Sequence, residues 1–244
     1  MFMGKHSLQD NRMIQKSKPS EIDFNSEFQR AMALMEDTQK NILLTGRAGT
    51  GKSTLLEYFR DHTKKKVIVL APTGVAAVNI QGQTIHSFFH FKPNVTPASI
   101  KRKKKPEKDR TTIYKKLTTI VIDEISMVRA DLLDCIDKFL RLNGPEEKQP
   151  FGGVQMIFIG DLYQLPPVVT SAERDIFKSH YPTPYFFSAK CFDQLNIEYI
   201  ELEKVYRQKD DEFVQLLNAI RNRSVTEKDL EKFNQRCDPN FEPP

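Results

Sequence analysis

One stretch of the sequence combines glycines, a lysine and a serine in a spacing suited to holding a phosphate chain. It matches the pattern GxxxxGK[ST] and reads Gly46-Arg47-Ala48-Gly49-Thr50-Gly51-Lys52-Ser53. Its glycines allow successive backbone N–H groups to turn toward a phosphate, and a helix that starts in the loop adds the positive end of its dipole. We expect Lys52 to bridge the β- and γ-phosphates of a nucleoside triphosphate and the Ser53 hydroxyl to bind Mg²⁺. The predicted nucleotide contacts in this stretch are Gly46, Ala48, Gly49, Thr50, Gly51, Lys52, Ser53 and Thr54.

Two acidic residues follow an apolar run farther along the chain. The run Ile120-Val121-Ile122 is typical of a buried strand, and it ends in Asp123-Glu124. A carboxylate at the C-terminal end of a parallel strand points into the crevice where open α/β sheets bind ligands. We therefore expect Asp123 to hold Mg²⁺ through water and Glu124 to take a proton from the attacking water. The alternative for two adjacent acids is a solvated loop, and the apolar strand before them argues against it.

A third strand, expected over residues 154–159, runs into Gly160-Asp161-Leu162-Tyr163-Gln164. A polar side chain at this strand end can reach the γ-phosphate, so Gln164 is the predicted sensor of its presence. The alternative is a plain turn capped by the Asp161 carboxylate.

The elements that must position these residues alternate between strand and helix patterns. Strands are expected over residues 41–45, 67–71, 119–122, 154–159 and 198–202, and helices over 27–35, 52–61, 127–142 and 212–221. This alternation predicts an α/β fold with a parallel central sheet flanked by helices. One domain is expected over residues 24–238, between a polar tail at 1–23 and a Pro-rich end at 239–244. Within it, residues 91–116 contain three prolines and read as a small insertion.

Composition sets further limits. The 244 residues are 39% hydrophobic and 28% charged, which is typical of a globular protein, and no apolar run approaches the roughly 18 to 20 residues that cross a bilayer. Lysine and arginine outnumber the acids by 37 to 32, a net charge of +5 that slightly favours polyanionic partners. The three cysteines have neither metal-site nor disulfide spacing, so we expect an intracellular protein.

Five ordered motifs together resemble those of superfamily 1B helicases, and within it the petite integration frequency (Pif) family of DNA helicases. The resemblance covers about residues 24–225. The motifs read Ala71-Pro72-Thr73-Gly74-Val75-Ala76-Ala77, Gln83-Thr84-Ile85-His86-Ser87-Phe88-Phe89, Asp123-Glu124-Ile125-Ser126-Met127, Gly160-Asp161-Leu162-Tyr163-Gln164-Leu165-Pro166-Pro167 and Val205-Tyr206-Arg207-Gln208.

The resemblance implies a RecA-like motor lobe that uses ATP and Mg²⁺, binds single-stranded DNA and duplex junctions, and acts as a monomer. It also implies 5′-to-3′ unwinding in genome maintenance, including repair, recombination and telomere maintenance. Arg207 resembles an arginine that stabilises the transition state at the γ-phosphate. The residues that resemble the family's DNA-contacting positions are Pro72, Thr73, Gly74, Thr84, His86 and Phe88.

Three of these assignments have structural alternatives. Phe88 could stack on a base or pack in the core. Gln29 resembles a glutamine that reads adenine, but Ser26-Glu27-Phe28-Gln29 also fits a helix capping box. The basic run Lys101 to Lys105 could bind DNA phosphates or form a solvated loop.

Motors of this superfamily hydrolyse ATP between two lobes, and no second α/β half is visible in this sequence. We therefore expect one lobe that hydrolyses ATP slowly and does not unwind DNA alone. Two other classes remain: a nucleotide-gated DNA-binding module without turnover, and another P-loop ATPase such as an oligomeric ring. Glu124 argues against the first. The segments Ala71-Pro72-Thr73-Gly74 and Thr84-Ile85-His86-Ser87 argue against the ring, which does not require them.

Overall fold

A six-stranded parallel sheet organises the described part of the computed structural model, which comprises residues 24–103, 110–171, 173–206, 211–235 and 237–238. The strand order is β3-β2-β4-β5-β1-β6, and all pairs of neighbours are parallel. The strands are β1 (Asn41–Gly46), β2 (Val67–Ala71), β3 (Gln83–Thr84), β4 (Thr119–Ile122), β5 (Gln155–Gly160) and β6 (Ile197–Leu202). The predicted α/β fold with a parallel sheet is confirmed. Strand β3 was not predicted, because two residues are too few to carry a periodic pattern.

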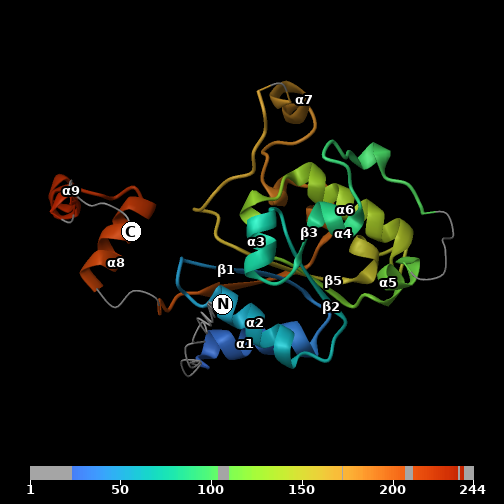
Figure 1. Ribbon diagram of the computed structural model, residues 1–244, viewed down its shortest axis with the longest axis horizontal. Coiled ribbons are helices and arrows are strands. Elements are labelled where there is room, and N and C mark those ends of the chain that lie inside the picture. Colours follow the sequence, from blue (N-terminus) through green and yellow to red (C-terminus); the bar gives the residue numbers. More distant parts are fainter. Residues whose placement is uncertain (1–23, 104–109, 172, 207–210, 236, 239–244) are drawn as a thin grey trace, which may run out of the picture.

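Helices cover both faces of this sheet (Figure 1). Successive side chains of a strand point to opposite faces, so Met156 and Phe158 of β5 join one core cluster while Ile157 and Ile159 join the other. Because both faces are covered, β4 and β5 are buried along their whole length, and each reads as a run without polar side chains after its first residue.

Helices on the two faces complete these clusters. One contains side chains from α4 (Ile85–Phe89), α5 (Arg110–Lys116) and α6 (Ala130–Asn143). The other contains side chains from α1 (Ser26–Asp37), α2 (Lys52–His62) and α3 (Gly74–Asn79). The helix predicted at 127–142 is α6, which begins three residues later than predicted because a 3₁₀ turn at Ile125–Met127 comes between β4 and α6.

The predicted insertion at 91–116 is anchored at both ends. A 3₁₀ turn at Pro97–Ser99 is followed by Ile100, and both Ile100 and Tyr114 of α5 are buried in the core. The Tyr114 hydroxyl donates to the Phe88 carbonyl at 2.8 Å. In the basic run, Lys103 N–H donates to Asn143 Oδ1 at 2.8 Å, while Lys104 and Lys105 lie outside the described residues.

The chain continues after β5 through α7 (Arg174–Lys178) and, after β6, into α8 (Asp211–Arg221) and α9 (Glu227–Asn234). Helices α8 and α9, drawn in orange and red, extend away from the sheet in Figure 1. Within the described ranges, every helix is too short or too polar to cross a bilayer.

Candidate nucleotide-binding site

The phosphate-binding loop connects β1 to α2, as the sequence predicts. Gly51 caps α2 with φ of 91°, a left-handed conformation that disfavours any residue with a Cβ atom. At Gly46, a Cβ atom would lie only 2.6 Å from Thr50 Oγ1 and 2.7 Å from the Leu202 carbonyl oxygen. Both glycines are therefore required by the backbone path of the loop.

Lys52 is folded back onto this loop. Its Nζ donates to the carbonyl oxygens of Gly46 at 2.7 Å and Arg47 at 2.9 Å. Burial lowers the pKa of Lys52, and the negative charges of Asp161, Glu124 and Asp123 oppose that shift. The loop lysine and three carboxylates thus share one electrostatic environment at the carboxyl edge of the sheet.

Asp123 and Glu124 follow β4, and Asp123 N–H donates to the Leu70 carbonyl at 2.9 Å, which ties this strand end to β2. Burial raises the pKa of Asp123 to about 6, and the nearby Glu124 charge adds to the rise. Glu124 has φ of 51° and ψ of 43°, a left-handed conformation that costs a residue with a side chain on the order of 1 to 3 kcal/mol. Such backbone strain is concentrated at functional sites.

Strand β5 lies between β4 and β1, so the turn after β5 sits between the acidic pair and the phosphate-binding loop. Asp161 in this turn is only 2% exposed. Its Oδ1 accepts from Tyr163 N–H at 3.1 Å, and its Oδ2 accepts from Gln164 Nε2 at 3.2 Å. The capped turn and the amide of Gln164 therefore occur together, and the sensing role of Gln164 stays a prediction.

Three functional candidates were missed from sequence. Asp161, considered only as a turn cap, is the carboxylate with the largest charge effect on Lys52. Arg221 donates from Nη1 to Asp161 Oδ2 at 2.6 Å, and Tyr206 N–H donates to the Gly49 carbonyl at 2.8 Å. Asp161 follows a buried strand and Tyr206 lies in the fifth helicase-like motif, so both had a signal in the sequence, whereas Arg221 had none.

The N-terminus of α1 also meets the loop. Asn25 Nδ2 donates to the Tyr206 hydroxyl at 3.2 Å, and the Tyr206 ring passes over Gly51. The alternative of a capping box formed by Ser26 and Gln29 is excluded, since Asn25 is the N-cap and accepts from Phe28 N–H. Gln29 instead donates from Nε2 to the Phe24 carbonyl at 2.7 Å, and its adenine contact stays a prediction.

The residues predicted to contact DNA lie at the ends of β2 and β3. Thr73 Oγ1 accepts from Ala76 N–H at the start of α3, and Thr84 Oγ1 accepts from Ser87 N–H at the start of α4. Gly74 faces open space, because a Cβ atom there would meet no heavy atom within 4 Å. The contacts of these residues with DNA phosphates stay a prediction.

Phe88 packs in the core, as the alternative to base stacking expected, and its contact with DNA stays a prediction. Its side chain is 8% exposed and packs edge-on against Phe89 at 4.9 Å and Tyr114 at 5.5 Å between ring centroids. The neighbouring His86 is half-buried, which lowers its pKa, and its predicted DNA contact is untested. Arg207, the predicted transition-state arginine, lies outside the described residues.

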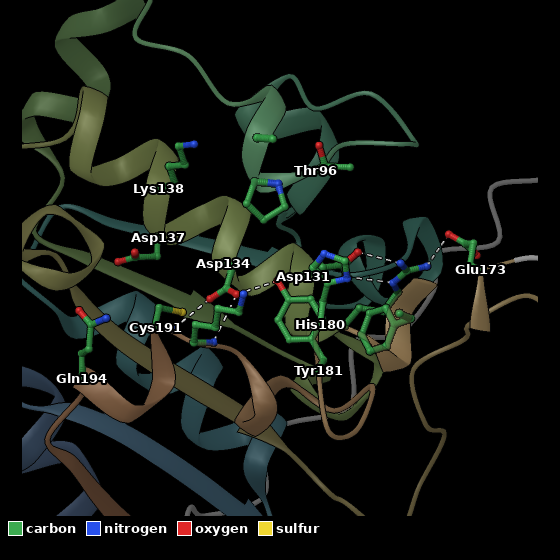
Figure 2. A pocket seen from close by; sticks show the side chains of 15 residues that line it. Thr96, Asp131, Asp134, Asp137, Lys138, Glu173, His180, Tyr181, Cys191 and Gln194 are labelled. Atoms are coloured by element: carbon green, nitrogen blue, oxygen red, sulfur yellow. Dashed lines mark hydrogen bonds and ion pairs between the residues drawn. The ribbon is translucent and has the colours of Figure 1, made fainter. Parts of the chain in front are cut away.

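A separate cavity of about 570 Å³ lies between α6, the turn Pro97–Ser99 and the segment from Glu173 to Gln194 (Figure 2). Its lining includes none of the predicted nucleotide contacts. Asp134 of α6 accepts from the Tyr181 hydroxyl at 2.8 Å and from Cys191 N–H at 2.9 Å. Arg129 joins Asp131 to Glu173 across the cavity. These charged groups anchor the segment that follows β5 to α6.

Asp134→Ala is expected to lower the free energy of unfolding by about 3 kcal/mol, because it leaves a buried hydroxyl and a buried N–H group without their acceptor. Denaturant unfolding measures this loss. Asp134→Asn keeps one acceptor oxygen and is the matched control, with a smaller loss. Equal stability of wild type and Asp134→Ala would contradict the anchoring role.

Comparisons with known proteins agree with this geometry. A family model described as PIF1-like helicase matches residues 24–231. The chain is 33% identical over 220 residues to the ATP-dependent DNA helicase RRM3 of Saccharomyces cerevisiae, and 36% identical over 221 residues to the ATP-dependent DNA helicase PIF1 of the same species. These alignments cover 88% and 86% of this chain, but 30% and 25% of the two relatives.

Among solved structures, the Pif1 helicase from Bacteroides in complex with ADP-AlF3 and ssDNA superimposes with a TM-score of 0.82 at 39% identity. The match covers 91% of this chain and 51% of that structure. The chain therefore spans about half or less of the length of these relatives.

Proposed function

Because the chain belongs to the PIF1-like helicase family, we propose that it is the nucleotide-binding motor lobe of an ATP-dependent DNA helicase. The Pif family resemblance drawn from the five motifs is confirmed. The observation that carries the proposal is the convergence of Lys52, Asp123, Glu124 and Asp161 at the ends of three adjacent strands. One cation and several carboxylates around a phosphate-binding loop suit phosphoryl transfer.

The described residues divide the work of binding. On binding a triphosphate, Lys52 exchanges the carbonyl oxygens of Gly46 and Arg47 for phosphate oxygens, and backbone N–H groups of the loop hold the β-phosphate. Ser53 and Asp123 would hold Mg²⁺, since hydroxyl and carboxylate oxygens are the ligands this ion prefers. The ion would neutralise negative charge on the phosphate chain.

Glu124 is the proposed general base. Its carboxylate follows the buried strand β4, and its left-handed backbone directs the chain sharply into the next turn. A carboxylate beside the γ-phosphate accepts the proton of the attacking water, and Gln164 orients the γ-phosphoryl group from the neighbouring strand end. Arg207 would add positive charge in the transition state.

The sheet also connects the proposed site of ATP hydrolysis to the proposed DNA contacts. Strand β2, which ends next to Thr73, pairs directly with β4, which ends at the acidic pair. The hydrogen bond from Asp123 N–H to the Leu70 carbonyl links these two strand ends. We propose that a shift of the acidic pair on hydrolysis moves Thr73 and Gly74 through this link between the strand ends.

The decisive experiment measures ATP turnover with and without single-stranded DNA, for this chain and for a version extended by a complete second lobe. We expect slow turnover and no unwinding by this chain, and DNA-stimulated turnover by the extended version. If single-stranded DNA does not change the ATP turnover of the extended version, the motor function is ruled out. Nucleotide-dependent DNA binding without any turnover would instead favour the non-catalytic module. The 5′-to-3′ direction, the monomeric state, the role in genome maintenance and the intracellular location are further parts of this proposal.

A further inference from the structure

Arg221, the last residue of α8, reaches back to the nucleotide site from 60 positions beyond Asp161. Its Nη1 lies 2.6 Å from Asp161 Oδ2, and its side chain is 18% exposed. The guanidinium also lies over the Tyr163 ring, 4.2 Å from the ring centroid. One arginine thus contacts two residues of the turn that carries the predicted γ-phosphate sensor.

The same carboxylate oxygen serves both Arg221 and the sensor. Asp161 Oδ2 accepts from Arg221 Nη1 and from Gln164 Nε2. If Gln164 turns toward a γ-phosphate, it must leave this oxygen, whereas Arg221 and Tyr163 N–H still hold the carboxylate. In that arrangement Arg221 is the cation that stays paired with Asp161, and Tyr163 N–H holds the other oxygen.

Charge makes this contact important for a triphosphate. Asp161 is almost fully buried, and Glu124 and Asp123 are the other carboxylates whose charges act on Lys52. A buried carboxylate without a partner repels a second anion strongly, because little water screens the two charges. ATP carries one phosphate more than ADP at the γ-position, so the repulsion falls mainly on ATP.

We propose that Arg221 is a positioning residue of the nucleotide site: it neutralises Asp161 and holds it away from the γ-phosphate, and so joins α8 to the nucleotide state. This inference rests on the proposed function, because it requires a triphosphate in the loop. It makes one distinctive prediction: removing the charge of Asp161 restores the ATP affinity that is lost with Arg221. An arginine that only contacted the phosphate could not be replaced in this way.

The test compares the affinities of ADP and of a nonhydrolysable ATP analogue, both with Mg²⁺, by calorimetry on the full chain. Arg221→Gln is expected to weaken the analogue about tenfold and ADP by less than about threefold, since the unpaired Asp161 charge faces the γ-phosphate. The double variant Arg221→Gln with Asp161→Asn is expected to recover the analogue affinity to within about threefold of wild type. Arg221→Lys keeps the charge and is expected to bind both nucleotides nearly normally.

Lys232→Ala is the matched control, because it breaks the exposed ion pair between Lys232 and Glu212 of α8 without touching Asp161. Equal loss of both nucleotides in Arg221→Gln, or no recovery in the double variant, overturns the inference while the proposed function stands. Failure of the wild-type chain to bind either nucleotide overturns both. If Arg221→Gln does not fold, Arg221→Lys and the double variant still decide the question through the ratio of the two affinities.

Discussion

Lys52→Ala is expected to weaken ATP binding at least about a hundredfold, which corresponds to roughly 2.7 kcal/mol. The lysine ammonium is already held by two loop carbonyls at the position where the phosphate chain enters. Charge-assisted hydrogen bonds to phosphate are the strong ones, and partial burial of this site reduces their screening by water. Titration of the chain with ATP and Mg²⁺ in a calorimeter measures the change.

Lys40→Ala is the matched control for this loss. Lys40 precedes β1 at the opposite end of the strand and forms an exposed ion pair with Glu198 at 2.7 Å. We expect it to leave ATP affinity unchanged, because a surface charge far from the loop is screened by salt. Unchanged ATP affinity in Lys52→Ala would contradict the assignment of the whole site.

Glu124→Gln is expected to reduce ATP turnover by a factor of about 10² to 10⁴, the usual contribution of a general base. ATP affinity is expected to stay within about threefold of wild type, since the amide keeps the size of the side chain and its hydrogen-bonding oxygen. Removing the Glu124 charge also lowers the pKa of Asp123, which favours the ionised carboxylate that Mg²⁺ requires. Phosphate release from a version of the chain extended by a complete second lobe gives the rate.

Glu57→Gln provides the comparison for turnover, because Glu57 is an exposed residue of α2 outside the predicted site. It is expected to hydrolyse ATP at the wild-type rate. A Glu124→Gln variant with more than about a tenth of wild-type turnover would assign the base to another residue. A variant that loses both turnover and ATP affinity would point to misfolding of the turn after β4.

Much of the site was predictable from sequence because its parts are local. The phosphate-binding loop needs glycines at fixed positions between a strand and a helix, and Gly51 adopts the left-handed conformation that such a loop requires. Strands β4 and β5 are buried on both faces, so they appear as apolar runs, and polar residues directly after them mark the strand ends. Asp123 and Glu124 were found in this way, and Gln164 was found as a polar residue of the turn that follows β5.

Local sequence patterns did not give the correct structure where one pattern fits two different local structures. Ser26 and Gln29 fit a capping box with Ser26 as the N-cap. The helix begins one residue earlier than that pattern implies, at Ser26, and Asn25 is its N-cap. Phe88 sits in a motif that resembles a DNA contact, yet its ring is enclosed by Phe89 and Tyr114, the latter from the predicted insertion. No periodicity in the chain separates a buried aromatic ring from an exposed one in a five-residue helix.

The chemical identity of the site therefore resides in short runs of the chain, whose backbone conformation and burial depend on near neighbours. The contacts between these runs depend on the order of the strands in the sheet. Because β5 is inserted between β1 and β4, Asp161 comes to lie beside Lys52, and the end of α8 brings Arg221 onto the same carboxylate. Contacts between residues 60 or more positions apart arise from chain packing, and a linear pattern carries no record of them.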